Sequence, residues 1–315
     1  MATVRGYVRL LRLPLFITAA ADAVAGYTVA WFGLRPNDQA RTPWDPVLAA
    51  LVAAVSTGLY LFGMVENDLA DRERDRRLLS DRPLATGEAG VGGAVLLLIV
   101  TAALAGFCAL GLFIVQRDDP RRGAAPLMVI ATFAVINLYN LSAKRGPPPV
   151  AMGVMGLARL MNFGIGVTAA IGVPMNVDWA MLGPRGPFWV RHGLAIACTS
   201  VIATGYSISA RRGYPVSTRP WQAVLLATVF AGLAMWMVVL PLFAARAGTA
   251  TTRLVPPLAR VVALVVLALL WPGRLWSPMG PQRKPAEYAP FIERALYWLV
   301  LLDAAFVVDR IMLQP

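Results

Sequence analysis

Long apolar stretches alternate with short polar, arginine-rich segments along almost the whole chain. The apolar stretches run roughly over residues 13–32, 46–66, 91–116, 124–141, 150–172, 190–209, 221–245, 254–272 and 290–311. Each approaches the roughly 20 residues that an α-helix needs to cross a bilayer. The pattern therefore predicts an all-α, polytopic integral membrane protein with about nine transmembrane helices, folded as a single domain over residues 1–315.

Composition supports a membrane protein. Of the 315 residues, 58% are hydrophobic and 15% are charged, and the mean hydropathy is +0.62. Soluble domains carry about 25% charged residues. The first apolar stretch follows Arg5, Arg9 and Arg12, as in a signal peptide, but it is longer than the apolar core of such a signal and many further spans follow. It is therefore expected to be the first transmembrane helix.

The basic residues lie mainly between the apolar stretches and predict the orientation of the chain. With the N-terminus in the cytoplasm, 17 Lys and Arg residues fall in cytoplasmic segments, 11 fall on the other side, and Arg159 lies within a span. This bias places the acidic segment at residues 67–75 in the cytoplasm, with arginines facing membrane lipid headgroups. No basic helix with interleaved aromatic residues is present, so nucleic acid is not an expected partner.

Cysteine and histidine usage excludes several kinds of site. Cys108 and Cys198 both fall inside apolar stretches and form no spaced pair, which indicates small buried side chains and neither a disulfide nor a metal site. His192 is the one histidine in the chain, so a zinc site built on several histidines is excluded.

The acidic segment, Asn-Asp-Leu-Ala-Asp-Arg-Glu-Arg-Asp at residues 67–75, follows the second apolar stretch. At helical pitch Asn67, Asp71 and Asp75 share one face. Like charges one turn apart cost a few tenths of a kcal/mol, roughly, and a bridging cation would reverse that sign. A solvated helix end is the alternative interpretation, in which Asp68 pairs locally with Arg72.

A few polar side chains lie inside the predicted spans, where burial in hydrocarbon costs free energy and suggests function. They are Asp22, Asn137, Asn140, Arg159 and Asn162. Arg159 is the most costly of them and most needs a partner. A structural ion pair between Asp22 and Arg159 and a ligand-binding role for both are equally consistent with this cost. Asp303 is expected nearer the far interface, where snorkelling or pairing with Arg310 would accommodate it.

The spacing of the acidic segment, followed by Arg82-Pro83-Leu84 and Gly87-Glu88, resembles the first aspartate motif of the UbiA superfamily of membrane prenyltransferases. Three other segments also resemble that family: Arg12-Leu13-Pro14, Leu-Tyr-Asn-Leu-Ser-Ala-Lys at residues 138–144, and Gly-Leu-Ala-Arg-Leu-Met-Asn-Phe at residues 156–163. The resemblance covers most of residues 5–170 and extends more weakly to the rest.

The resemblance implies a helical bundle around a central cavity and Mg²⁺-dependent transfer of a prenyl group from an isoprenyl diphosphate to an aromatic or other small acceptor. Such chemistry depends on neutralising the departing pyrophosphate, and Mg²⁺ prefers carboxylate and phosphate oxygens. Carried over by position, the metal ligands are Asn67, Asp68, Asp71 and Asp75. Asp71, Asp75 and Lys144 are the implied catalytic residues. The implied diphosphate-binding residues are Asp22, Tyr139, Asn140, Arg159, Asn162, Arg211 and Arg212.

One departure from the family pattern lies in the loop at residues 206–217, where a second aspartate motif is expected. No Asp or Glu occurs anywhere between residues 179 and 286, so Arg211 and Arg212 would neutralise phosphate directly. This loop and residues 18–27 resemble the EboC-type branch of UbiA-like proteins, which implies a bacterial plasma membrane and secondary metabolism.

Two other functions are alternatives to the transferase. A non-catalytic, EboC-like component that binds or transports an isoprenoid or another metabolite is the main alternative, and the acid-free loop favours it. A secondary transporter built from inverted repeats is disfavoured, because no repeat of residues 67–88 is visible. No sequence pattern indicates an oligomeric state.

Overall fold

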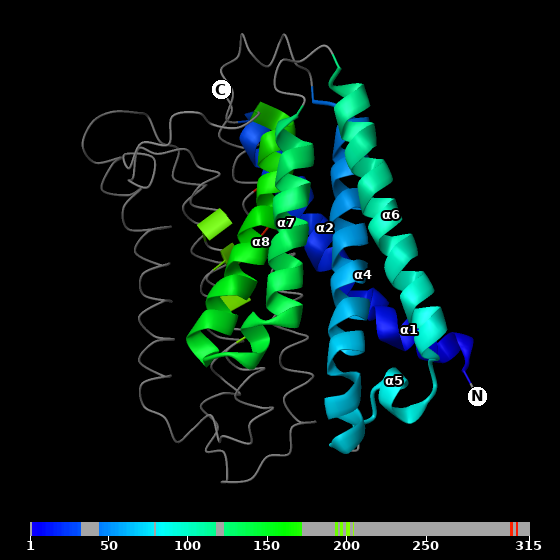
Figure 1. Ribbon diagram of the computed structural model, residues 1–315. Coiled ribbons are helices and arrows are strands. Elements are labelled where there is room, and N and C mark those ends of the chain that lie inside the picture. The colour runs from blue at the N-terminus through cyan, green and yellow to red at the C-terminus, as the bar shows by residue number, and fades with distance from the viewer. Residues whose placement is uncertain are drawn as a thin grey trace.

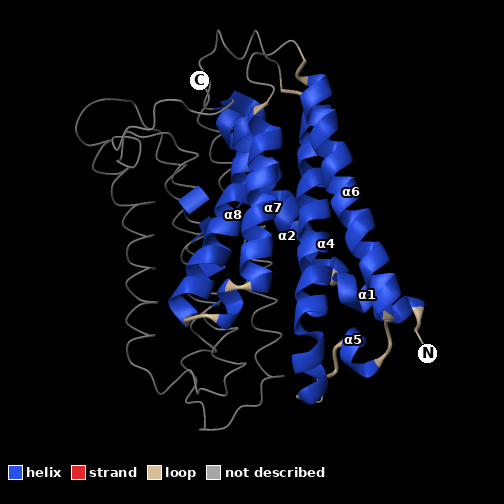
Figure 2. Cartoon of the chain, viewed as in Figure 1, coloured by secondary structure: helices blue, strands red, loops and turns tan. Residues whose placement is uncertain are grey.

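The computed structural model describes residues 2–32, 44–78, 80–117 and 123–171, with residues 193, 194, 196, 197, 200, 201, 204, 303, 304 and 307. Every regular element among these residues is a helix and none is a strand, which confirms the all-α prediction for this part of the chain (Figure 2). Its long helices are α2 (Phe16–Phe32), α4 (Pro46–Arg77), α6 (Val91–Val115), α7 (Ala124–Leu141) and α8 (Pro148–Ile171).

Four short elements complete the described structure: α1 (Val4–Leu11), η1 (Leu13–Leu15), α5 (Pro83–Thr86) and η2 (Ala143–Arg145). Helices α1 and α5 lie beside the end of α4 that carries the acidic segment (Figure 1). Arg12 separates α1 from η1 in a left-handed conformation, with φ of 47°, which is uncommon for a residue other than glycine. The N-terminal segment therefore turns at Arg12 before the first long helix begins.

Helix α4 continues well beyond its apolar stretch. Asp45 caps its N-terminus, where the side chain accepts a hydrogen bond from the Val47 amide at 2.7 Å, and Pro46 occupies the first turn. Three arginines in the last turn complement the partial negative charge of the helix C-terminus. The acidic segment consequently forms the final turns of this long helix.

Five helical segments of the described residues are long and apolar enough to cross a membrane, and they match the first five predicted spans. Helix α6 exposes large apolar side chains, with 73% of the Phe107 surface and 61% of Leu96 accessible. An exposed apolar face of this kind suits contact with lipid. The four spans predicted from residue 190 onwards lie largely outside the described residues, so the total of nine stays a prediction.

Helices α2 and α8 approach each other closely because glycines occupy their contact. A Cβ atom at Gly166 would lie 1.9 Å from the Ala23 carbonyl oxygen, and one at Gly26 would lie 2.2 Å from the Phe163 carbonyl oxygen. Small residues permit such backbone contact between membrane helices. Helix α4 packs against both α2 and α6 (Figure 1). This arrangement brings the polar side chains of α2, α4 and α8 together.

Candidate functional site

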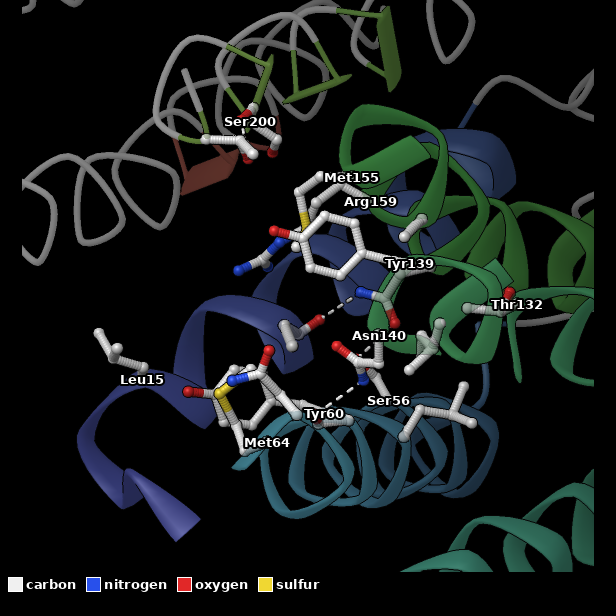
Figure 3. Close-up of a pocket in the computed structure, with 18 of the residues that line it drawn as sticks. Leu15, Ser56, Tyr60, Met64, Thr132, Tyr139, Asn140, Met155, Arg159 and Ser200 are labelled. Atoms are coloured by element: carbon white, nitrogen blue, oxygen red, sulfur yellow. Dashed lines mark hydrogen bonds between the residues drawn. The ribbon is translucent and has the colours of Figure 1, made fainter. Parts of the chain in front are cut away.

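A cavity of about 220 Å³ lies among the helices and reaches the acidic segment. Figure 3 shows Tyr139, Met155 and Arg159 on one side of it and Tyr60 and Met64 on another. The lining residues are Arg12, Leu15, Ala19, Ser56, Leu59, Tyr60, Gly63, Met64, Asn67, Thr132, Ile136, Tyr139, Asn140, Met155, Ala158, Arg159, Asn162, Ser200 and Thr204. Apolar walls with a few convergent polar groups are typical of a small-molecule site.

The acidic segment is mostly buried. Asn67, Asp68 and Asp71 retain only 5%, 2% and 4% of their accessible surface. By contrast, the Glu73 side chain is 70% exposed. Since buried carboxylates require partners, the solvated-helix interpretation describes only the outward face of these last turns.

Asp68 is held by two arginines from distant parts of the chain. Its Oδ1 accepts a hydrogen bond from Arg12 at 2.8 Å and another from Arg82, and the Asn67 amide donates to the same oxygen at 3.1 Å. The Arg82 Nε also lies 4.0 Å from Asp75 Oδ2. The expected pairing of Asp68 with Arg72 is not among these contacts. Asp68 therefore joins the N-terminal turn, the end of α4 and the start of α5.

Lys144 provides the cation for Asn67 and Asp71. Its Nζ lies 3.0 Å from Asp71 Oδ1 and donates to Asn67 Oδ1 at 3.0 Å, while its side chain is only 4% exposed. The neighbouring Arg145 donates to the Ala70 carbonyl oxygen at 3.1 Å, which fastens η2 to α4. The two residues thus join the end of α7 to the acidic segment.

Asp22 and Arg159 form an ion pair inside the bundle. Arg159 donates from NH1 to Asp22 Oδ2 at 2.7 Å and from NH2 to the Thr18 hydroxyl at 3.1 Å. Asp22 is fully buried, whereas the Arg159 side chain keeps 13% exposure and lines the cavity. The structure therefore contains the predicted structural pair and still presents the guanidinium to the cavity.

Asp303 corrects an expectation about the last apolar stretch. Snorkelling was one accommodation expected for it, yet only 3% of its surface is accessible. The other was pairing with Arg310, which lies outside the described residues. The Asp303 carboxyl group interacts electrostatically with both Asp22 and Arg159. A pattern of hydropathy alone could not reveal this contact, because the partners are far apart in the sequence. One guanidinium therefore faces two buried carboxyl groups.

Two amide side chains are oriented by residues that sequence analysis did not single out. Asn162 accepts from the Ser56 hydroxyl at 2.7 Å and donates to the Ala19 carbonyl oxygen at 2.8 Å. Asn140 donates to the Glu66 carboxylate at 2.8 Å and to the Gly63 carbonyl oxygen at 3.0 Å. The position of Glu66 directly before the acidic segment is the one feature of the sequence that indicates its role in orienting Asn140.

The predicted site residues fall into three groups: those on the cavity wall, those outside the described residues, and those in the ion pairs beside the wall, which are Asp22, Asp68, Asp71, Asp75 and Lys144. Arg12 joins Asn67, Tyr139, Asn140, Arg159 and Asn162 on the cavity wall, although Arg12 was singled out only as part of a family motif. Arg211 and Arg212 lie outside the described residues, so their phosphate-binding role stays a prediction. The structure consequently gathers side chains from four long helices and the N-terminal turn around one cavity.

The described residues include oxygen groups of the kind that bind magnesium. Asn67 Oδ1 and Asp71 are oxygen ligands that Mg²⁺ accepts at about 2.1 Å. However, the Lys144 ammonium lies 3.0 Å from oxygens of both residues, where it would repel a metal ion bound to them. No group of three His, Cys, Asp or Glu side chains suited to a metal occurs within the described residues. As these residues lie, they do not fit a metal ion, and the magnesium prediction stays a prediction.

The chain has the UbiA-like fold, because solved structures of UbiA homologues match almost its full length. The apo UbiA homologue from Aeropyrum pernix K1 matches with a TM-score of 0.58 and 16% identity over 93% of this chain and 97% of its own. Neither a scan of protein-family models nor a search of curated proteins gives a match.

Two further structures show the same fold. The UbiA homologue from Archaeoglobus fulgidus bound to GPP and Mg²⁺ has a TM-score of 0.55 and 19% identity, covering 96% of this chain and 99% of its own. A digeranylgeranylglyceryl phosphate synthase has a TM-score of 0.55 and 17% identity, covering 98% of this chain and 99% of its own. The Archaeoglobus protein has also been solved with DMAPP and Mg²⁺ and with Cd²⁺.

Proposed function

We propose that the protein is a membrane prenyltransferase that binds an isoprenyl diphosphate in the described cavity and transfers the prenyl group to an aromatic or other small acceptor. One observation carries this proposal: a cavity with mainly apolar walls ends at Arg12, Asn67 and the buried acidic segment. An apolar wall suits a prenyl chain, and the polar end suits a diphosphate. The GPP-bound and DMAPP-bound homologues of the same fold support this ligand class.

In the proposed reaction, the bond between the allylic carbon and the diphosphate oxygen breaks, and its electron pair leaves with pyrophosphate. A new bond forms from the acceptor to the allylic carbon, and the acceptor then loses a proton. Arg12 and Arg159 line the cavity and supply positive charge for the leaving group. The apolar walls exclude water from the cation, and the Tyr60 and Tyr139 rings provide aromatic surface that attracts positive charge.

Wild-type protein in lipid nanodiscs should release pyrophosphate from geranyl diphosphate in the presence of a mixture of phenolic acceptors. The Asp71→Asn variant should slow this release by about 10²-fold or more, as expected for loss of a buried charged group in the site. Asp81→Asn is the matched control, because the Asp81 side chain is 95% exposed. Equally slow release of pyrophosphate by all three proteins would contradict the proposed enzymatic activity.

The EboC-like, non-catalytic binding or transport component is the second candidate function. The absence of acidic residues between 179 and 286 favours it, because the family's second aspartate motif is expected in that interval. This alternative predicts saturable binding of geranyl diphosphate without release of pyrophosphate. Direct binding measurements on the same nanodisc samples therefore separate the two functions. The bacterial plasma membrane and the cytoplasmic orientation of the acidic segment are part of both proposals.

A further inference from the structure

The acidic segment is neutralised by cations that belong to the chain. Asp68 accepts from Arg12 and Arg82, while Asp71 pairs with Lys144. The Asp68 and Asp71 side chains are only 2% and 6% exposed. Because a buried carboxylate that loses its partner is strongly destabilising, these ion pairs should persist in the folded protein.

Lys144 occupies the position between two oxygens that a bridging metal ion would need. The Asn67 and Asp71 Oδ1 atoms are both 3.0 Å from its Nζ, and the Asn67 carbonyl oxygen accepts from it at 3.3 Å. The lysine is also held by its neighbours, since Ala143 is buried and Arg145 donates to the Ala70 carbonyl oxygen. A metal ion could therefore bind the Asn67 and Asp71 Oδ1 atoms only by displacing the buried Lys144 ammonium group.

Arg12 lines the cavity, and Arg82, which is not one of its lining residues, is held beside Arg12 by their shared partner Asp68. Both donate to the same atom, Asp68 Oδ1, and Arg82 Nε also lies 4.0 Å from Asp75 Oδ2, so the two guanidinium groups share the Asp68 carboxylate and Arg82 has Asp75 as a second, more distant partner. The left-handed conformation of Arg12 turns the chain so that its side chain lines the cavity. Guanidinium groups match phosphate oxygens through their planar arrangement of donors, which makes arginine an effective phosphate ligand without a metal.

We propose that the diphosphate of the ligand binds directly to the Arg12–Arg82 pair without a bridging metal ion. In this arrangement Asp68 is a positioning residue that holds both arginines, and Lys144 replaces a cation at Asn67 and Asp71. The inference rests on the proposed isoprenyl diphosphate ligand and specifies how this chain recognises it. It also accounts for the absence of acidic residues between 179 and 286, since a metal-free site needs no second aspartate motif.

The test measures binding of a geranyl diphosphate analogue in which sulfur replaces the oxygen between the geranyl carbon and the first phosphorus. This replacement suppresses cleavage of the bond to the allylic carbon. Full-length protein in nanodiscs is titrated in excess EDTA and, separately, in excess Mg²⁺. The dissociation constants should agree within about threefold. In EDTA, Asp68→Asn should weaken binding about tenfold or more, because two charge-assisted hydrogen bonds lose their acceptor charge.

Arg12→Lys provides a second variant that keeps the charge and loses the planar donor group, so it should also weaken binding in EDTA about tenfold. Asp81→Asn is the matched control and should bind as wild type does. The thermal unfolding midpoint of each variant shows whether that variant is folded. If Asp68 had a purely structural role, its replacement would lower this midpoint and leave the affinity of the folded protein unchanged.

The outcomes separate this inference from the proposed function. Binding in Mg²⁺ but not in EDTA would overturn the metal-free site and leave the isoprenyl diphosphate ligand intact. Unaltered affinity of folded Asp68→Asn and Arg12→Lys in EDTA would overturn the roles of those residues. Failure of the wild-type protein to bind in either solution would remove the proposed function itself.

Discussion

Replacing Arg159 should destabilise the bundle more than replacing Asp22, because one guanidinium serves two buried carboxyl groups. Arg159 lies 2.7 Å from Asp22 Oδ2 and also interacts with Asp303. Arg159→Met would leave both carboxyl groups facing each other without a cation. Removing one partner of a buried ion pair costs about 3–5 kcal/mol in free energy of unfolding.

Asp22→Asn should be milder, because the Asp303 carboxyl group remains as a partner for Arg159. In the variant the guanidinium donates to a neutral amide oxygen in place of a carboxylate, a difference of about 1–1.5 kcal/mol. The double variant Asp22→Asn with Asp303→Asn should be about as unstable as Arg159→Met, since the guanidinium then has no carboxylate partner among these groups.

These free energies can be measured by SDS-induced unfolding of the protein in mixed micelles, followed by tryptophan fluorescence. Arg74→Met is the control, since Arg74 is exposed and its replacement should change stability by less than about 0.5 kcal/mol. The reasoning is refuted if Asp22→Asn costs as much as Arg159→Met, because Asp303 would then not share the guanidinium.

Three further substitutions test the packing and the acidic segment. Gly166→Ala should prevent stable folding in detergent, because a Cβ atom there would lie 1.9 Å from a carbonyl oxygen of α2, whereas a Cβ atom at Gly153 would meet nothing within 4 Å and Gly153→Ala should fold normally. Ser56→Ala should cost about 1–2 kcal/mol of unfolding free energy, since it removes a buried 2.7 Å hydrogen bond. The Lys144→Met variant should show a rise in thermal unfolding midpoint on addition of Mg²⁺ that wild type lacks, because the Asp71 carboxylate loses its ammonium partner and can bind the metal ion. An equal rise in both proteins would contradict the position assigned to Lys144.

The positions of the described helices could be predicted from local sequence. Apolar stretches at 46–66, 91–116, 124–141 and 150–172 each became one long helix, because length and hydropathy are properties of a single segment. The break at Arg12 was not predicted, since its left-handed conformation depends on contacts with Asp68 and the rest of the N-terminal turn.

The members of the candidate site were also largely identifiable, whereas their partners were not. Sequence spacing offered Arg72 to Asp68 at i+4, yet the structure pairs Asp68 with residues 56 and 14 positions away. A charged side chain on a helix surface has several possible partners nearby. The packing of α1 and α5 against α4 determines which cations contact the buried Asp68 carboxylate.

By itself, the sequence determined which segments are long and apolar enough to cross a membrane and which oxygen and nitrogen groups are available for chemistry, because both follow from residue type and local spacing. Only the tertiary structure decided that Lys144 lies between Asn67 and Asp71 and that Asp303 is buried beside Asp22 and Arg159. Those contacts join residues that are distant along the chain, and their geometry depends on how closely the helices pack.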